Sequence, residues 1–182
     1  ALSARAQGAV AVASTGGEIF VYAADATKLY EIDVSETVRV VTGDYDEASS
    51  DAQVEWAQFG NTVLATHYDT PLQGMAIGSG TFSDHITSSD KPQGRHIGIV
   101  RDQVVLGDTT DTTDGRQPTR FWWSGLNDST DFTPSASTLC DFQNIPDAGK
   151  VMKLVGGAEY GLVFMERQII RMSFAGPHWH TS

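Results

Sequence analysis

The residues whose types and spacing could bind a metal ion lie near the end of the chain. His178 and His180 stand two positions apart and are two of the five histidines. Side chains at this spacing lie on the same face of a strand, so both imidazoles could reach one metal ion. The spacing places no third ligand beside them, and the sequence therefore predicts no metal site here.

Two acidic segments, 44–51 and 108–114, could supply oxygen ligands for calcium. Calcium takes about six to eight oxygen ligands, and the helix–loop–helix calcium motif places them at fixed positions. Neither segment has that register. Because Asp, Thr and Gly are also the residues that build tight turns, we interpret both segments as solvated connections between strands.

No motif for catalysis or cofactor binding is complete. The segment 156–161 has glycines spaced as at the start of a phosphate-binding loop, but Leu162 and Val163 stand where that loop requires Lys and Ser or Thr. Ser79 lacks the flanking pattern of a nucleophile elbow. Two carboxylates for glycoside hydrolysis cannot be selected among 23 acidic residues. We therefore predict no catalytic residue, no cofactor and no enzymatic activity.

The composition narrows the classes of partner. Lys and Arg number 12 against 23 Asp and Glu, which gives a formal net charge of -11 at pH 7. Proteins that bind the nucleic-acid backbone broadly need a basic face, so we expect no direct, sequence-specific nucleic-acid partner. No apolar run approaches the roughly 20 residues that span a bilayer, and we expect no membrane partner. Cys140 is the only cysteine, which excludes an intrachain disulfide.

The elements that must position these residues are predicted to be short β-strands. Runs rich in β-branched and aromatic residues recur about every 8 to 10 residues and are bounded by Gly, Asp or Ser. We expect loops at 78–90 and 108–118 and a long linker at 127–148. The strands gather into groups that cover residues 7–43, 52–90, 95–126 and 149–177.

Recurring groups of antiparallel strands indicate the fold class. Repeated four-stranded meanders are typical of β-propeller blades. We therefore predict an all-β fold, a β-propeller-like array of antiparallel four-stranded blades, complete or incomplete, with a β-sandwich as the alternative. Residues 1–182 are expected to form a single β domain. Because the sequence does not begin with Met, we expect it to be part of a longer chain.

Adjacent tryptophans are the most distinctive aromatic feature. Trp122 and Trp123 must point to opposite faces of a strand. Core packing is the first interpretation of both, but on an exposed blade one of them would serve as an interface anchor, a role that Trp often has. Asp128 and Phe142, in the segments that follow, complete the set of candidate interface anchors.

Five segments, taken in order, resemble one family. They are similar to β-propeller structural proteins of short-tailed bacteriophages and prophages, of the tail-hub and packaged-DNA-stabilisation type. The likeness extends over roughly residues 17–177, and members of that family are usually much longer. The matching segments are 54–60 (VEWAQFG), 95–102 (RHIGIVRD), 120–128 (RFWWSGLND), 141–147 (DFQNIPD) and 156–164 (GGAEYGLVF).

This resemblance implies a structural virion protein of the phage tail, made in the cytoplasm of a bacterial host. Such a protein joins portal-side components to tail parts and seals or stabilises the packaged DNA, without catalysis. The implied partners are the portal or adaptor, a tail fibre or tailspike, and copies of the chain itself in a ring, so that a homo-oligomer is expected in the assembly. The alternative is a carbohydrate-binding or glycan-processing β-propeller, which would need a pocket with an aromatic platform and convergent carboxylates.

Overall fold

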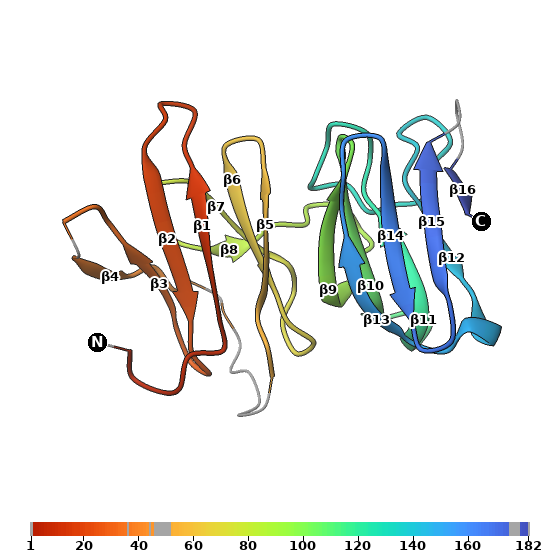
Figure 1. Ribbon diagram of the computed structural model, residues 1–182, viewed down its shortest axis with the longest axis horizontal. Helices are drawn as coiled ribbons and strands as arrows, with labels where there is room; N and C mark the ends of the chain where they lie inside the picture. Colours follow the sequence, from red (N-terminus) through yellow and green to blue (C-terminus); the bar gives the residue numbers. More distant parts are fainter. Residues whose placement is uncertain (1, 36, 44, 46–51, 175–178, 182) are drawn as a thin grey trace. The chain divides into compact units, whose positions relative to one another are not determined.

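The computed structural model describes residues 2–35, 37–43, 45, 52–174 and 179–181. The described chain is all-β, as the sequence predicted, with 53% strand and 2% helix. The single helical turn among the described residues is η1 (Pro146–Ala148). The strands form four antiparallel sheets of four strands each. In every sheet the strands follow one another in chain order, so each sheet is a simple meander (Figure 1).

The four meanders follow one another along the chain. The first contains β1 (Gly8–Ala13), β2 (Ile19–Ala24), β3 (Leu29–Ile32) and β4 (Val38–Val40), and the second contains β5 (Glu55–Phe59), β6 (Thr62–Thr66), β7 (Gln73–Ala76) and β8 (Ser83–Asp84). The third contains β9 (Gln93–Val100), β10 (Gln103–Asp111), β11 (Gly115–Trp123) and β12 (Asp141–Asn144), and the fourth contains β13 (Val151–Val155), β14 (Tyr160–Met165), β15 (Ile169–Phe174) and β16 (Trp179–Thr181).

The chain divides into two compact units, Ala1–His85 and Ile86–Ser182. The first unit holds the first two sheets, and the second unit holds the last two. Each unit has its own cluster of buried apolar side chains between its sheets. Each unit is therefore built from two consecutive meanders that share one core.

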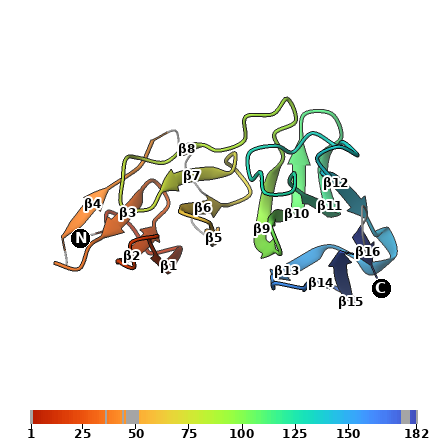
Figure 2. The same cartoon turned by 90° about the horizontal axis from the view of Figure 1, so that it is seen from above.

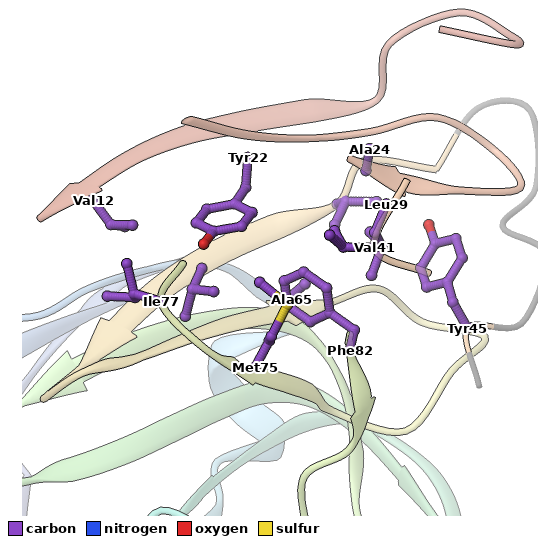
Figure 3. Packing of buried hydrophobic residues seen from close by; sticks show 12 residues of the cluster. Val12, Tyr22, Ala24, Leu29, Val41, Tyr45, Ala65, Met75, Ile77 and Phe82 are labelled. Atoms are coloured by element: carbon purple, nitrogen blue, oxygen red, sulfur yellow. The ribbon is translucent and has the colours of Figure 1, made fainter. Parts of the chain in front are cut away.

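The core of the first unit is rich in aromatic rings. Tyr22 on β2 lies edge-on to Phe82 with ring centroids 5.9 Å apart, and Trp56 on β5 packs against both rings. Leu29 on β3 is fully buried in the same cluster. Figure 3 shows Tyr22 and Leu29 of the first sheet directed toward Met75 on β7 and Phe82 just before β8. Burial of this apolar surface is the main force that holds the two meanders together.

In the second unit, the two sheets form two layers (Figure 2). Phe121 and Trp123 on β11 face Val151 and Leu154 on β13, and all four belong to one buried cluster. Trp122, between them in sequence, points to the other face of the sheet because side chains alternate along a strand. The predicted division of the tryptophan pair between two faces is confirmed.

Consecutive sheets in each unit meet at their first strands. In the first unit β1 contacts β5, and the Val54 amide donates to the Gln7 carbonyl at 2.9 Å just before these strands. In the second unit β9 contacts β13, and the Arg101 amide donates to the Gly157 carbonyl at 2.8 Å just after them. The same relationship between neighbouring meanders thus occurs twice in the chain.

Two segments differ from the sequence prediction. Residues 108–118, expected to be a loop, belong to the long β10–β11 hairpin. The Asp111 carboxylate accepts the amides of Thr113 and Asp114 at 2.8 and 2.7 Å, and Gly115 has a φ of 66°. These features close a tight turn, so a polar segment that looked like a loop forms strands instead.

The expected linker at 127–148 also contains structure. It supplies β12, which pairs with β11 and completes the third sheet beyond residue 126, where that group of strands was expected to end. β8, in the expected loop at 78–90, likewise completes the second sheet. Both strands are short, with four and two residues, and pairing with a distant partner defines them. Local sequence patterns carry little of that information.

Candidate functional site

Two of the four candidate interface anchors lie opposite each other on neighbouring strands. Trp122 on β11 is the register partner of Phe142 on β12, and their ring centroids are 4.8 Å apart. Trp122 is 4% exposed, and Phe142 is partly buried. Trp122 is therefore a packed side chain of the third sheet, and Phe142 is the more accessible member of the pair. The role of both as interface anchors stays a prediction.

Arg120 lies on the same face and fixes this aromatic pair. Its guanidinium carbon is 4.2 Å from the Phe142 ring centroid and 5.5 Å from that of Trp122. Its Nη1 and Nη2 donate to the carboxylates of Asp111 and Asp114 at 2.7 and 2.6 Å. Its side chain is 3% exposed and that of Asp111 is 8% exposed, so this ion pair is buried, whereas the Asp114 side chain is 44% exposed.

The guanidinium group of Arg120 connects the turn of one hairpin to the edge strand of the sheet. Besides the two carboxylates near the β10–β11 turn, it binds the Asn144 side-chain oxygen on β12 through Nε at 3.0 Å. A buried charge is tolerated only when it is paired and its donors have partners. The arrangement meets that requirement, and it holds the acidic segment 108–114 as part of a rigid structure rather than as a set of metal ligands.

Trp123 is anchored on the opposite face of β11. It is 6% exposed, its indole Nε1 donates to the Leu139 carbonyl at 2.9 Å, and its ring centroid is 6.1 Å from that of Phe121. Trp and Tyr usually find a partner for their polar atom when they are buried. Both tryptophans are thus covered by their own chain, and neither forms the exposed aromatic platform that a glycan site would need.

Asp128 lies in an ordered, exposed turn. Its carboxylate accepts the backbone amide and the hydroxyl of Thr130 at 2.9 and 2.7 Å. The Thr130 carbonyl in turn accepts the Thr87 amide at 3.0 Å, and the Phe132 amide donates to the Ser88 hydroxyl at 2.9 Å. The segment 126–140 is therefore tied to the segment that precedes β9. As an interface anchor, Asp128 stays a prediction, but its position is fixed by the fold.

Cys140 is buried beside these residues and is not suited to be a nucleophile. It is a free cysteine, 2% exposed. Burial raises the pKa of its thiol to about 12, and the adjacent Trp122 indole lowers it by less. Only the thiolate is strongly nucleophilic, so this group stays protonated and unreactive at neutral pH. Cys140 is therefore a small buried residue of the second unit.

The sequence analysis did not single out Asp25, whose carboxylate accepts a dense set of hydrogen bonds. It is fully buried in the first unit, where its two oxygens accept hydrogen bonds at 2.6 to 3.2 Å. Burial acts to raise the pKa of this carboxyl group, but the hydrogen bonds outweigh it and hold the pKa well below its ordinary value. The donors are the amides of Ser3, Ala4, Thr27 and Lys28 and the hydroxyls of Ser3, Thr27 and Tyr30.

Part of the Asp25 site could have been inferred. Asp followed two residues later by Thr is a common turn in which the carboxylate binds backbone amides ahead of it. The bonds from Thr27 and Lys28 belong to that turn. The bonds from Ser3 and Tyr30 come from elsewhere in the chain, and they attach the segment before β1 to the first sheet.

A second buried polar network joins the two sheets of the first unit. The Tyr22 hydroxyl donates to Glu31 at 2.8 Å and accepts the Gly78 amide at 2.9 Å. Arg39 pairs with Glu31 at 2.7 Å and donates to the Gly80 carbonyl at 3.1 Å. Burial raises the pKa of the Tyr22 hydroxyl above its ordinary range. The Tyr22 hydroxyl therefore stays protonated at neutral pH and serves as a hydrogen-bond donor to Glu31.

The metal-binding hypotheses find no support among the described side chains. Within the described ranges, no group of three or more His, Cys, Asp or Glu side chains could hold a metal ion. His178 and the side chain of His180 lie outside the described residues, as does most of the segment 44–51. The described part of the chain also contains no helix of a length and apolarity that would cross a bilayer.

A comparison of the chain with known protein families and with curated proteins found no match. The chemistry of the described residues is therefore the basis for a functional proposal. Among the described residues, the buried side chains of Arg120, Glu31 and Asp25 take part in ion pairs and hydrogen bonds within the chain.

Proposed function

We propose that the chain is a structural virion protein of a tailed bacteriophage. In this role it is a component of the tail hub or portal–tail connector that seals or stabilises packaged DNA and docks other tail proteins. Its partners would be the portal or adaptor, a tail fibre or tailspike, and further copies of itself. The proposal combines the resemblance of five ordered segments to that family with an all-β architecture of the kind the resemblance implies.

The observation that carries the proposal is the repetition of one structural unit. Four meanders of four antiparallel strands follow one another, and in both units the first strand of one sheet contacts the first strand of the next. Blades of a β-propeller are sequential four-stranded meanders whose first strands gather around a central axis. We therefore propose that the four sheets are propeller blades, in preference to a β-sandwich.

The interior of the sheets supports a structural rather than catalytic role. Arg120, Glu31 and Asp25 are buried charges, and each is held by several partners within the chain. Such networks fix the sheets in one arrangement and leave the connecting loops to make contacts. The acidic balance of the chain would steer it toward partners with basic surfaces.

Particle composition provides the test. Particles would be induced from a bacterium that carries the coding sequence, purified on a density gradient, and analysed by mass spectrometry and immunogold labelling. The proposal predicts that the chain co-purifies with the major capsid protein, which serves as the internal control, and that gold particles mark the tail vertex. Recovery of the chain only in the unassembled protein fraction, with capsid protein in intact particles, would overturn the proposal.

A further inference from the structure

The outer face of the first sheet is apolar throughout. Phe20, Tyr22 and Leu29 point into the core, so the alternate residues of the same strands point away from it. Register pairing places those alternate residues side by side. No charged side chain stands among them. The outward positions are Ala9, Ala11, Ala13, Ile19, Val21, Ala23, Tyr30, Ile32, Val38 and Val40.

Several of these side chains are open to solvent. Ile19 is 52% exposed, Val40 is 50% exposed, and Val38 is also exposed. The segment before β1 covers one corner, where Ser3 binds the Tyr30 hydroxyl. A contiguous apolar patch of this kind marks an interaction surface in soluble proteins. We call it the alanine-rich face, after the four alanines of β1 and β2.

The outer face of the fourth sheet combines large apolar side chains with two cationic ones. Val163, Ile170 and Met172 point into the core of the second unit, so their neighbours along the strands point outward. Ile169 is 57% exposed. We call this surface the bulky face, and its outward side chains are Lys153, Val155, Tyr160, Leu162, Phe164, Ile169, Arg171 and Ser173.

The two faces are complementary in size. The outward residues of β1 are all alanines, whereas those of β14 are Tyr160, Leu162 and Phe164. This chain already packs its sheets in that way, because a Cβ atom added at Gly107 of the third sheet would lie 2.8 Å from Val151 of the fourth, and one added at Gly98 would lie 3.2 Å from Leu154. Close packing of large residues against small ones is how facing sheets exclude voids.

The two faces are also complementary in charge. Among the described side chains of the bulky face, the charged ones are Lys153 and Arg171, both cationic in a chain whose net charge is -11. The alanine-rich face has acidic residues at its border, where Glu18 precedes Ile19 and Asp33 follows Ile32. Two bulky faces would oppose cation to cation and large to large. Pairing between unlike faces avoids both conflicts.

We propose that the alanine-rich face of one copy docks on the bulky face of a second copy, so that chains associate head to tail. This deepens the proposed assembly role by assigning the surfaces through which copies meet. A contact between unlike faces leaves one free face on each end of a dimer, so association continues into a closed ring or an open filament. A standard interface buries about 800 Å² on each partner. We expect one sheet face of four short strands to bury less area, so association of the isolated chain should be weak.

Complementation between two variants tests the proposal. Val40→Lys would block the alanine-rich face, and Ile169→Glu would block the bulky face. Sedimentation velocity would be measured from about 10 μM to about 1 mM, a range in which weak complexes dissociate. The average mass of the unmodified chain should rise with its concentration. Each variant alone should remain a monomer. An equal mixture should form dimers and no larger species, because only one intact pair of faces remains.

Controls separate this proposal from the alternatives. Thr112→Lys in the exposed β10–β11 turn should associate like the unmodified chain, and circular dichroism verifies the fold of every variant. If Val40→Lys disturbs folding, Val38→Lys replaces it. Persistent self-association of one single variant would indicate pairing of like faces and overturn the proposal, as would an unmodified chain that stays monomeric at about 1 mM. Either failure leaves the particle test of the virion role unaffected, because that test does not depend on which faces pair.

Discussion

The guanidinium carbon of Arg120 lies 4.2 Å above the ring centroid of Phe142. This contact joins the central strand β11 to the edge strand β12, and two carboxylates and an amide oxygen hold the guanidinium in place. The contact therefore helps to hold β12, a strand of only four residues, at the edge of the third sheet. Loss of this one side chain should therefore affect both the hairpin turn and the sheet edge.

Replacement of Arg120 by Ala should strongly destabilise the second unit. Removal of the cation leaves Asp111, whose side chain is 8% exposed, without its partner in a buried site. Breaking a buried ion pair in this way costs about 3–5 kcal/mol of unfolding free energy. Urea denaturation followed by tryptophan fluorescence measures the change.

The matched control for Arg120 is Lys150→Ala. Lys150 pairs with Glu166 at 3.5 Å, and both side chains are substantially exposed. Exposed pairs contribute at most about 1 kcal/mol, so this variant should unfold close to the unmodified chain. Equal destabilisation by the two substitutions would show that burial does not distinguish the pairs.

Gly156→Ala tests the close approach of the third and fourth sheets. A Cβ atom at Gly156 would overlap the backbone carbonyl of Ile99 on β9. Because backbone atoms cannot move aside like a flexible side chain, we expect a loss of at least about 2 kcal/mol. Gly16→Ala is the control, since its nearest new neighbour would be the Ser14 hydroxyl at 3.5 Å, and it should change stability by less than about 0.5 kcal/mol. A neutral Gly156→Ala would mean that these sheets do not pack as closely as described.

The Asp25 carboxylate should make the first unit sensitive to acid. The pKa of this group in the folded protein lies below its ordinary value of 3.8. The unfolded chain therefore takes up the proton first, and the stabilisation is complete above about pH 5 and is lost as the pH falls toward the folded pKa. Asp25→Asn should cost at least about 2 kcal/mol at pH 7. It should also flatten the dependence of stability on pH below about pH 5.

Asp33→Asn provides the comparison for Asp25. The Asp33 carboxylate accepts two amides, from Ser35 and Thr37, in an exposed turn. Its replacement should lower stability less than that of Asp25, because the two bonds it accepts lie in an exposed turn. Stability would be measured by thermal unfolding at a series of pH values, and an unchanged acid limb in Asp25→Asn would contradict the assignment.

Cys140 should resist thiol reagents in the folded protein. A thiol whose pKa is about 12 has on the order of a thousandfold less thiolate at neutral pH than an ordinary cysteine. Because Cys140 is the sole cysteine, labelling with a chromogenic disulfide reports on this site alone. Labelling should be rapid when the chain is unfolded in roughly 6–8 M urea. In buffer without urea, labelling should be at least about 100-fold slower. Rapid labelling in buffer would show that the site opens readily.

The sequence predicted where strands lie better than it predicted which strands pair with each other. Runs of β-branched and aromatic residues bounded by Gly, Asp or Ser predicted strands such as β5 and β6, because this signal is local. The hairpin at 108–118 was missed because its acidic side chains are paired with a residue outside the turn. Arg120 binds the carboxylate of Asp114, six positions before it, and that of Asp111, nine positions before it. β12 was missed because its pairing with β11 crosses a segment of 17 residues.

The candidate site shows the same limit. Spacing along a strand was sufficient to place Trp122 and Trp123 on opposite faces, since that follows from the geometry of any strand. The stack of Arg120 on Phe142, and the bonds from Ser3 and Tyr30 to Asp25, join residues that no local pattern relates. Tertiary contacts of this kind become visible only when the sheets are assembled.

The central structural claim is that the two meanders within each unit meet through their first strands, and amide hydrogen exchange tests it most directly. The Val54 amide, bonded to Gln7, and the Arg101 amide, bonded to Gly157, join one sheet to the next, so both should exchange slowly, at rates near those of amides inside β6 and β10. The amide of Thr112 in an exposed turn should exchange fast and serve as the reference. Fast exchange at Val54 and Arg101, with β6 and β10 still protected, would contradict the account by showing that the meanders fold without this contact.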